Sequence, residues 1–519
     1  MAYRSLEQPA GKPHAALAVW LGYLAMCIGM FMAILDIQIV AGSLPEIAAD
    51  LGVSPSRLSW IQTVYLIAEI IAIPLTGWLT RLLTLRILFV AAVTGFTLAS
   101  VGCATVANLP ALALWRAVQG FSGGALIPTV FTAVFLIFPE PLHIRATLIA
   151  GVTAMLAPTL GPALGGYITE TYGWRWIFLL NLGPGVFAAV VTSLCLTAGS
   201  PQWRLFRELD RISLVLFILS LAAIELALKE APEQGWLSGG VLWLLLVHFA
   251  AGAAAIRRSL GHSTPVVDFR VMAEPAFAAA SFYSFVLGAG LYGSVYLLPV
   301  FLGLVRHHGP LEIGGIMIVT GFAQLVTAPL AAMAERRSDP RFLTALGYSL
   351  FGTGLILNGF QTYQTDFDAL VLPQILRGCG VMLCLLPTTS IALESRENGA
   401  LAGASGLFNA MRNLGGAIGI AVVDTMVRSR FSAHVEGIVA RLQAGDPKAA
   451  IEAGLPVERF HNVPLAPIDQ ATRDFVEPLI ERAATVASFN DAWLALGCFF
   501  LLSLCALPFL KRAPLDSAR

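Results

Sequence analysis

Several ionisable side chains lie within long apolar runs of the sequence, where a charged group is costly. Those in the first quarter of the chain are Asp36, Glu69 and Arg116. An ionisable group at membrane depth normally faces a cavity or a charged partner, so each is a candidate functional residue. A buried carboxyl group can bind and release a proton, whereas a guanidinium keeps its charge and tunes any acid nearby. Together these residues could couple proton movement to another process.

The carboxylate of Asp36 also has a structural interpretation. It lies in LDIQIVAGSLP (35–45), toward the outer end of its apolar run. A carboxylate at a helix end could simply contact the outer headgroups of a bilayer. Proton coupling and headgroup contact therefore both remain open for Asp36.

Glu69 closes a polar stripe on an otherwise apolar segment. Gln62, Tyr65 and Glu69 recur at helical spacing and so share one helix face. Glu69 could carry a proton or meet the charge of a cationic substrate. Its structural alternative is an ion pair with Arg116 or Arg412.

Further polar and aromatic side chains could line a pocket for a small lipophilic substrate. Because acidic and basic groups coexist in the apolar runs, both cations and lipophilic anions remain possible substrates. Glu225 and Lys229 are four residues apart, which predicts a structural pair. Gln374 and Arg377 are weaker binding candidates. The candidate substrate-binding residues are Gln62, Tyr65, Gln119, Tyr292, Tyr296, Gln324, Asn409 and Arg412.

The composition requires lipid as the solvent for most of the chain. Of the 519 residues, 57% are hydrophobic and only 12% are charged, and the mean hydropathy is +0.76. The net charge is zero, which gives no electrostatic case for binding nucleic acid. The Cys and His residues show no metal-ligand spacing and no nucleotide-binding GxxxxGK[ST] motif occurs, so we expect no metal, cofactor or ATP coupling.

Apolar runs long enough for a transmembrane helix predict fourteen spans, that is, an all-α integral membrane protein. Lys and Arg concentrate in the tails and in alternate short loops, which predicts that both termini are cytoplasmic. Residues 428–489 then form an outward-facing segment, of which residues 475–489 could extend the last span as a helix. A weak internal repeat relates residues 113–128 to residues 372–387.

One predicted span, around residues 144–169, is rich in small residues and proline. Ala157, Gly161 and Gly165 recur at every fourth residue and so line one face, along which two helices can approach closely. Pro158 and Pro162 interrupt the backbone hydrogen bonds of the same helix. A tightly packed, bent helix is expected, and Gly166 widens its groove; the structural alternative is a packing kink.

Several segments resemble one family across the whole chain. LDIQIV, RAVQG, GPALGG, WRWIFLLNL and FNAMRNLGG resemble motifs of the EmrB-type 14-span drug:H+ antiporter family of the major facilitator superfamily. The resemblance implies two six-helix bundles and two inserted spans. It places the N-terminal bundle in residues 1–200, the insert and hinge in 201–275, and the C-terminal bundle in 276–519. It also makes Gly161, Pro162, Gly165 and Gly166 the antiporter motif.

The resemblance also implies a function. It points to a proton-coupled multidrug efflux transporter, not an enzyme, that works by alternating access in a bacterial inner membrane. Asp36, Glu69 and Arg116 would couple the protons, and a periplasmic adaptor protein would dock on residues 428–489 and lead to an outer-membrane channel. Export of a siderophore or endogenous metabolite is the alternative function, and a solvated cap is the alternative for residues 428–489.

One loop departs from the family pattern. GWLTRLLTLR (77–86) has Thr80 where the family usually has Asp, and Thr84 where it usually has Gly. The Asp normally helps to lock the cytoplasmic side. That gating contact is therefore in doubt here.

Overall fold

The computed structural model describes residues 17–52, 55–197, 199–207, 209–262, 265–335, 337–393, 398–455 and 470–510. Within these ranges the regular structure is helical, without strands. Thirteen of the described helical segments are long and apolar enough to cross a membrane. In addition, α6 (His143–Tyr172) has 30 residues and packs against α1 (Leu17–Gly42) and α13 (Pro310–Glu335). The predicted all-α membrane fold is confirmed.

The first helices of the chain pack mainly on one another. α3 packs on α5, α1 on α6 and α8, and α4 on α5 and α8. A short helix, α2 (Leu44–Leu51), follows α1. The predicted sixth span (175–198) is interrupted and forms two helices. The remaining helices of this group are α3 (Pro55–Leu83), α4 (Leu85–Thr105), α5 (Leu109–Ile137), η1 (Glu140–Leu142), α7 (Arg175–Leu179) and α8 (Leu182–Cys195).

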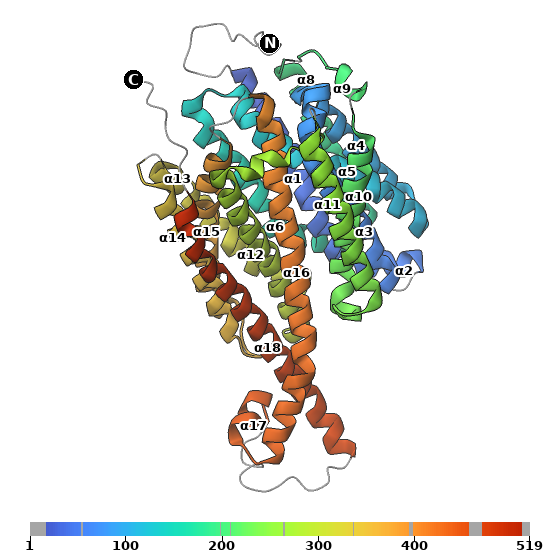
Figure 1. Ribbon diagram of the computed structural model, residues 1–519. Helices are drawn as coiled ribbons and strands as arrows, with labels where there is room; N and C mark the ends of the chain where they lie inside the picture. The colour runs from blue at the N-terminus through green and yellow to red at the C-terminus, as the bar shows by residue number, and fades with distance from the viewer. Residues whose placement is uncertain are drawn as a thin grey trace.

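The last helices of the chain form a second group, in which α12 packs on α16 and α14 on α15. Between the two groups, α10 packs on α11 and contacts both α3 and α16 (Figure 1). α3 and α5 contact α16, and α6 contacts α13 and α15, so the two groups meet along several helix pairs. The helices after α8 are α9 (Arg204–Arg207), α10 (Arg211–Gln234), α11 (Gly239–Gly261), η2 (Phe269–Ala273), α12 (Pro275–Val305), α13, α14 (Pro340–Leu357), η3 (Asn358–Phe360), α15 (Phe367–Leu393), α16 (Asn398–Gln443), α17 (Pro447–Ala453), α18 (Gln470–Leu502) and η5 (Ser503–Phe509).

Local sequence explains several helix starts. The side chain of Asn108 accepts a hydrogen bond from the amide of Ala111 and so caps α5. Asp339 caps α14 and Asp446 caps α17 in the same way, each followed by a proline. These caps satisfy backbone donors in the first turn of each helix.

The predicted outward segment is an extension of two spans. The apolar run of the thirteenth span was expected to end near residue 427, but α16 continues without a break to Gln443 and has 46 residues. α18 begins at Gln470, which confirms that residues 475–489 extend the last span. With α17 these helix ends form a projection at one end of the molecule (Figure 1). Its own small core includes Ile438, Leu442, Ala450 and Ile480.

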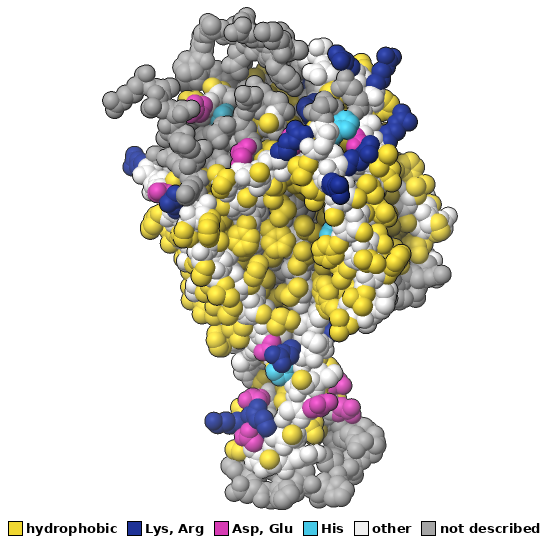
Figure 2. Space-filling model, in the orientation of Figure 1, with side chains coloured by type: hydrophobic (Ala, Val, Ile, Leu, Met, Phe, Trp, Pro, Cys, Tyr) yellow, Lys and Arg dark blue, Asp and Glu magenta, His cyan; other side chains and the backbone are white. Residues whose placement is uncertain are grey.

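The surface shows where the bilayer lies. A broad band of hydrophobic side chains covers the middle of the face that Figure 2 shows. In this view most Lys and Arg side chains lie beyond the edge of the band opposite the projection. This distribution agrees with the charge bias that the loops show in sequence.

Glycines bring the helices of the site together. A Cβ atom on Gly120 of α5 would lie 2.2 Å from the carbonyl oxygen of Tyr65, and one on Gly124 would lie 2.5 Å from that of Glu69. The backbones of α3 and α5 therefore touch at the level of the polar stripe. This contact fixes how far α5 is rotated and which of its side chains face α1.

Candidate functional site

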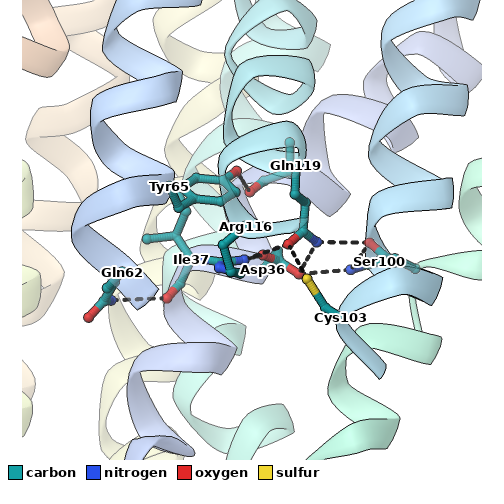
Figure 3. Close-up of polar contacts among 10 residues, drawn as sticks. Asp36, Ile37, Gln62, Tyr65, Ser100, Cys103, Arg116 and Gln119 are labelled. Atoms are coloured by element: carbon teal, nitrogen blue, oxygen red, sulfur yellow. Dashed lines mark hydrogen bonds and ion pairs between the residues drawn. The ribbon is translucent and has the colours of Figure 1, made fainter. Parts of the chain in front are cut away.

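The centre of the polar site is the carboxylate of Asp36 on α1, whose residue is 2% exposed. Arg116 of α5 donates from Nη1 to Oδ2 and forms an ion pair. Gln119 Nε2 donates to Oδ1 over 3.0 Å (Figure 3). Asn181 Nδ2 donates to the same oxygen over 2.8 Å. Asp36 is thus a buried carboxylate, and both of its oxygens accept hydrogen bonds. Its alternative placement at a helix end, in contact with headgroups, does not describe this structure.

Arg116 is completely buried within the same network. Its Nη1 also donates to Oε1 of Gln119 over 2.7 Å, and its guanidinium lies 4.1 Å from the centre of the Tyr65 ring. The Nε and Nη2 atoms have no hydrogen-bond partner among the described residues. Asp36 therefore supplies the negative charge that makes this buried cation tolerable.

Two members of the network were not singled out from sequence. The Ser100 hydroxyl accepts hydrogen bonds from Gln119 and Asn181 over 2.8 and 3.2 Å. Asn181 lies between α7 and α8, where the predicted span is interrupted. The motif WRWIFLLNL contains Asn181 and was the available signal, whereas nothing distinguished Ser100 from other small residues.

Glu69 stands apart from this network. It is 4% exposed, and its carboxylate forms no hydrogen bond or ion pair with another described residue. The structural alternative of an ion pair with Arg116 or Arg412 is therefore not formed. Arg116 is directed to Asp36 instead, because Gly120 and Gly124 set the rotation of α5 against α3.

The inserted helix α10 brings a second carboxylate toward Glu69. Glu225 is 8% exposed and lies near Glu69. The predicted pair between Glu225 and Lys229 is not among the ion pairs of the described residues. The ammonium of Lys229 lies 3.8 Å from the centre of the Trp60 ring and 3.9 Å from Glu230. Glu69 and Glu225 are thus two buried acids near one another without a cation bound to either.

The candidate substrate-binding residues do not form one cluster. Tyr65 and Gln119 belong to the Asp36 network, and Gln62 Nε2 donates to the carbonyl of Ile37 over 3.5 Å at its margin (Figure 3). Tyr296 of α12 donates to Asp424 of α16 over 2.8 Å and so belongs to a different set of helices.

Tyr292 and Arg412 mark the centre between the two groups of helices. Tyr292 of α12 lies near both Glu69 and Arg412. Arg412 is 5% exposed and has no ion pair among the described residues, with the rings of Phe131 and Phe408 at 5.7 and 5.3 Å. Asn409, one turn away on α16, donates to a carbonyl of its own helix.

The small-residue face of α6 packs on α1 beside Asp36. A Cβ atom on Gly161 would lie 2.3 Å from Cβ of Gln38, and one on Gly165 would lie 3.0 Å from Cα of Ile39. Gly166 is buried as well, and Pro162 lies within α6, although its side chain is outside the described residues. The predicted close helix contact is present. It lies within the first group of helices, while α6 also contacts α13 of the second group.

The departure in the loop between α3 and α4 also has a structural outcome. Thr80, at the position of the family's usual Asp, donates to the carbonyl of Thr76 on its own helix over 2.7 Å. Arg81 donates to the carbonyl of Pro265 over 3.1 Å and so connects α3 to the segment after α11. No carboxylate takes part in these two contacts.

Comparison with known proteins decides the family. A model of the Major Facilitator Superfamily matches residues 26–420. The chain belongs to this superfamily. It is 38% identical over 424 residues to the colistin resistance protein EmrB of Acinetobacter baumannii, covering 82% of this chain and 83% of that protein. It is 27% identical over 496 residues to the multidrug export protein EmrB of Escherichia coli, covering 95% of each.

Other relatives support the same assignment. The fatty acid resistance protein FarB of Neisseria gonorrhoeae is 27% identical over 511 residues, 97% of each chain. Among solved structures, the human organic anion transporter MFSD10 has a TM-score of 0.62 at 14% identity, with 94% of this chain and 99% of that chain covered. At this identity the likeness concerns the fold alone. The superfamily match and the EmrB relatives together show that this chain is an EmrB-type transporter and not an enzyme.

Proposed function

We propose that this chain is a proton-coupled efflux transporter of a bacterial inner membrane that exports lipophilic compounds by alternating access. The observation that carries the proposal is the buried network in which Asp36 pairs with Arg116. The names of the relatives, which include multidrug export, colistin resistance and fatty acid resistance, support the direction and kind of substrate. The proposal includes an orientation in which both termini of the chain face the cytoplasm.

The network explains how a proton could change the packing. A proton on Asp36 cancels the charge that offsets Arg116, and it removes one of the acceptor sites used by Gln119 or Asn181. These donors come from α5 and from the junction of α7 and α8, and Ser100 of α4 accepts a hydrogen bond from each of them. Five helices, including α1, therefore meet around one carboxylate. Neutralising a buried ion pair from one side is costly, which favours a different arrangement of these helices.

The contacts between the two groups of helices are where the rearrangement would be transmitted. α3 touches α16, and α6 touches α13. Tyr292, Arg412 and Glu69 lie near the first of these contacts, and Gln324 on α13 lies near the second. In this proposal, substrate binds between the groups and proton uptake at Asp36 and Glu69 drives their movement.

The proposal can be tested in membrane vesicles with an imposed proton gradient. In inverted vesicles, wild-type protein is expected to load substrate only when the lumen is acidified. Asp36→Asn and Glu69→Gln should remain folded and lose gradient-driven transport. Asp50→Asn is the matched control, because Asp50 lies on the surface in an ion pair with Arg175. Wild-type transport by both buried-site variants would contradict the proton-coupling assignment.

We further propose that the projection of α16, α17 and α18 docks a periplasmic adaptor protein, which leads to an outer-membrane channel. The projection has its own apolar core, and Arg441 pairs with Asp446 and Glu452 to brace it. Among its described residues, two large apolar side chains are exposed, Ile451 by 59% and Phe475 by 65%. Exposed apolar side chains on this projection favour a role in binding another protein over the alternative role of a solvated cap.

The docking proposal predicts a split between two assays. Ile451→Glu together with Phe475→Glu should leave transport in vesicles intact and remove drug resistance of whole cells. Cross-links from the projection to an adaptor should disappear in the same variant. Full resistance of cells that carry this variant would show that the projection is not the docking site.

A further inference from the structure

The second group of helices has a polar contact that corresponds to the ion pair of Asp36 in the first group. That ion pair joins α1 to α5, the first and fourth long helices of their group. In the second group the first and fourth long helices are α12 and α15, and Arg377 of α15 donates from Nη2 to Oγ of Ser294 on α12 over 2.7 Å. The second group therefore has a guanidinium at this contact, with a hydroxyl in place of the carboxylate.

Arg377 is a buried cation without an acidic partner. It is 2% exposed, and none of the ion pairs among the described residues includes it. No carboxylate in the described parts of the chain lies near enough to interact with its charge. Its Nε and Nη1 atoms have no hydrogen-bond partner there either, and the rings of Phe351 and Trp493 lie 5.9 and 5.6 Å from the guanidinium. An isolated charge is so costly to bury that a counter-ion is expected.

The Arg377 side chain lines a small cavity that has room for about one water molecule. Thr320, Gln324 and Gln374 supply the rest of its polar wall, and no acidic residue lines it among those that the structure describes. Thr320 donates to Gln374, which donates in turn to the carbonyl of Ile316, so these two side chains are already engaged. Gln324 has an Oε1 atom without a partner in the described structure, and turning its amide would present the NH2 group at that place. The cavity thus combines an uncompensated cation with available hydrogen-bond donors.

The size and depth of the cavity restrict what can occupy it. A water molecule would accept hydrogen bonds from Arg377 but would leave its positive charge uncompensated, whereas an anion would do both. A carboxylate or phosphate group is too large for a space of this size, but a chloride ion is only slightly larger than a water molecule. Arg377 lies about 15 Å along α15 from its first residue, which is too deep for the headgroup of a bilayer lipid.

We propose that this cavity binds one monatomic anion, which in the cell is chloride, as the counter-ion of Arg377. The ion gives the second group of helices the buried negative charge that Asp36 gives the first. Pro158 of α6 borders the cavity from the first group, so the ion also lies where the two groups meet. It is a resident part of the fold and not the exported compound, so the inference does not depend on the proposed transport function.

The test exchanges chloride for an anion that is too large for the cavity. The melting temperature of purified full-length protein in a neutral detergent is measured by tryptophan fluorescence, while sodium gluconate is replaced by sodium chloride at constant ionic strength. A ligand that binds only the folded state stabilises it increasingly as its concentration rises above the dissociation constant. The melting temperature of the wild type should therefore rise by about 2–5 °C between about 1 and 100 mM chloride, and bromide should act in the same way.

Four variants assign the effect to this cavity. Arg377→Gln removes the charge and Ser294→Asp supplies a carboxylate beside it, so the melting temperature of either variant should no longer depend on chloride. In gluconate, Ser294→Asp should melt above the wild type, because its carboxylate replaces the missing ion; this comparison keeps the test decisive if Arg377→Gln does not fold. Arg270→Gln changes an exposed arginine on η2, and Arg412→Gln changes the other buried arginine without an ion pair in the described structure. Both should respond to chloride as the wild type does.

Bromide also locates the ion directly. In crystals of the full chain grown with sodium bromide, an anomalous scattering peak is expected within hydrogen-bond distance of the Arg377 guanidinium. A chloride response of the same size in the wild type, Arg377→Gln and Ser294→Asp would be a general salt effect and would overturn the proposal. So would the absence of a response in the wild type, a response lost only in Arg412→Gln, or the absence of a bromide peak beside Arg377.

Discussion

The ion pair between Asp36 and Arg116 permits a double-mutant cycle whose outcome follows from burial. Asp36→Asn preserves shape but leaves the fully buried guanidinium without its counter-charge, and two of its nitrogens already lack partners. Breaking a buried pair from one side costs about 3–5 kcal/mol. The cost of Arg116→Gln should lie at the lower end of this range, because Gln119 and Asn181 still donate to the carboxylate of Asp36.

The double variant Asp36→Asn/Arg116→Gln contains no unpaired charge. Its cost should therefore be smaller than the sum of the single costs, with a coupling free energy of about 2–3 kcal/mol. The free energy of unfolding is measured by denaturing-detergent titration in mixed micelles, followed by tryptophan fluorescence. Single costs that add to within about 0.5 kcal/mol would refute the pairing. Transport should stay absent in the double variant, because stability returns without the carboxylate that is proposed to bind the proton.

Four further perturbations test separate parts of the structure. Gly161→Ala should cost about 1–3 kcal/mol and reduce transport, because its Cβ would lie 2.3 Å from Gln38, whereas Gly303→Ala, with nothing within 4 Å, should leave melting temperature and transport unchanged. Asn181→Leu removes a donor from Asp36 and should abolish transport at a cost of about 1–3 kcal/mol, and normal transport would show that the broken span is not part of the site. Arg306, the amide of Phe367 and His308 lower the pKa of Asp366, in the loop before α15, from 3.8 to about 2, so its stabilising contribution is present above about pH 4 and is lost only as pH falls through about 2. Asp366→Asn should therefore lower the melting temperature at both pH 5.5 and pH 8, because Arg306 is charged at both, and a loss confined to one of these pH values would contradict this. Thr84→Gly should raise the melting temperature, as measured beside Thr84→Ala.

The sequence was sufficient to predict the fold and the two ends of the main ion pair. Long apolar runs and the Lys/Arg bias define the spans, because lipid requires satisfied backbone groups within each span. Asp36 and Arg116 stood out because charges at membrane depth are rare. Which acid faces Arg116 could not be read from spacing, since it depends on the rotation of α5 that Gly120 and Gly124 impose on contact with α3.

Hydropathy also marks the edge of the bilayer and not the end of a helix. α16 continues to Gln443 because its polar outer part still forms intrahelical hydrogen bonds and packs its apolar face on α18. Conversely, the apolar run of the sixth span hides the interruption at Leu180 and Asn181. In both places tertiary contacts decide the backbone, and a one-dimensional pattern does not contain them.

Thr84 shows a local conflict between sequence and backbone that the Gly substitution resolves. It is the single residue between α3 and α4 and has φ 79° and ψ 157°, a region that only glycine adopts without strain. For a β-branched residue this costs about 1–3 kcal/mol. Its hydroxyl is also buried without a hydrogen-bond partner in the described structure.

Glycine at this position would remove both penalties, at the expense of greater freedom in the unfolded chain, about 0.5–1 kcal/mol. A net gain of roughly 1–2 kcal/mol is therefore expected from Thr84→Gly. Thr84→Ala removes the hydroxyl but retains the positive φ, so it should gain clearly less. If alanine stabilised as much as glycine, the buried hydroxyl and not the backbone would be the source of strain, and the family's preference for glycine in this loop would need another explanation.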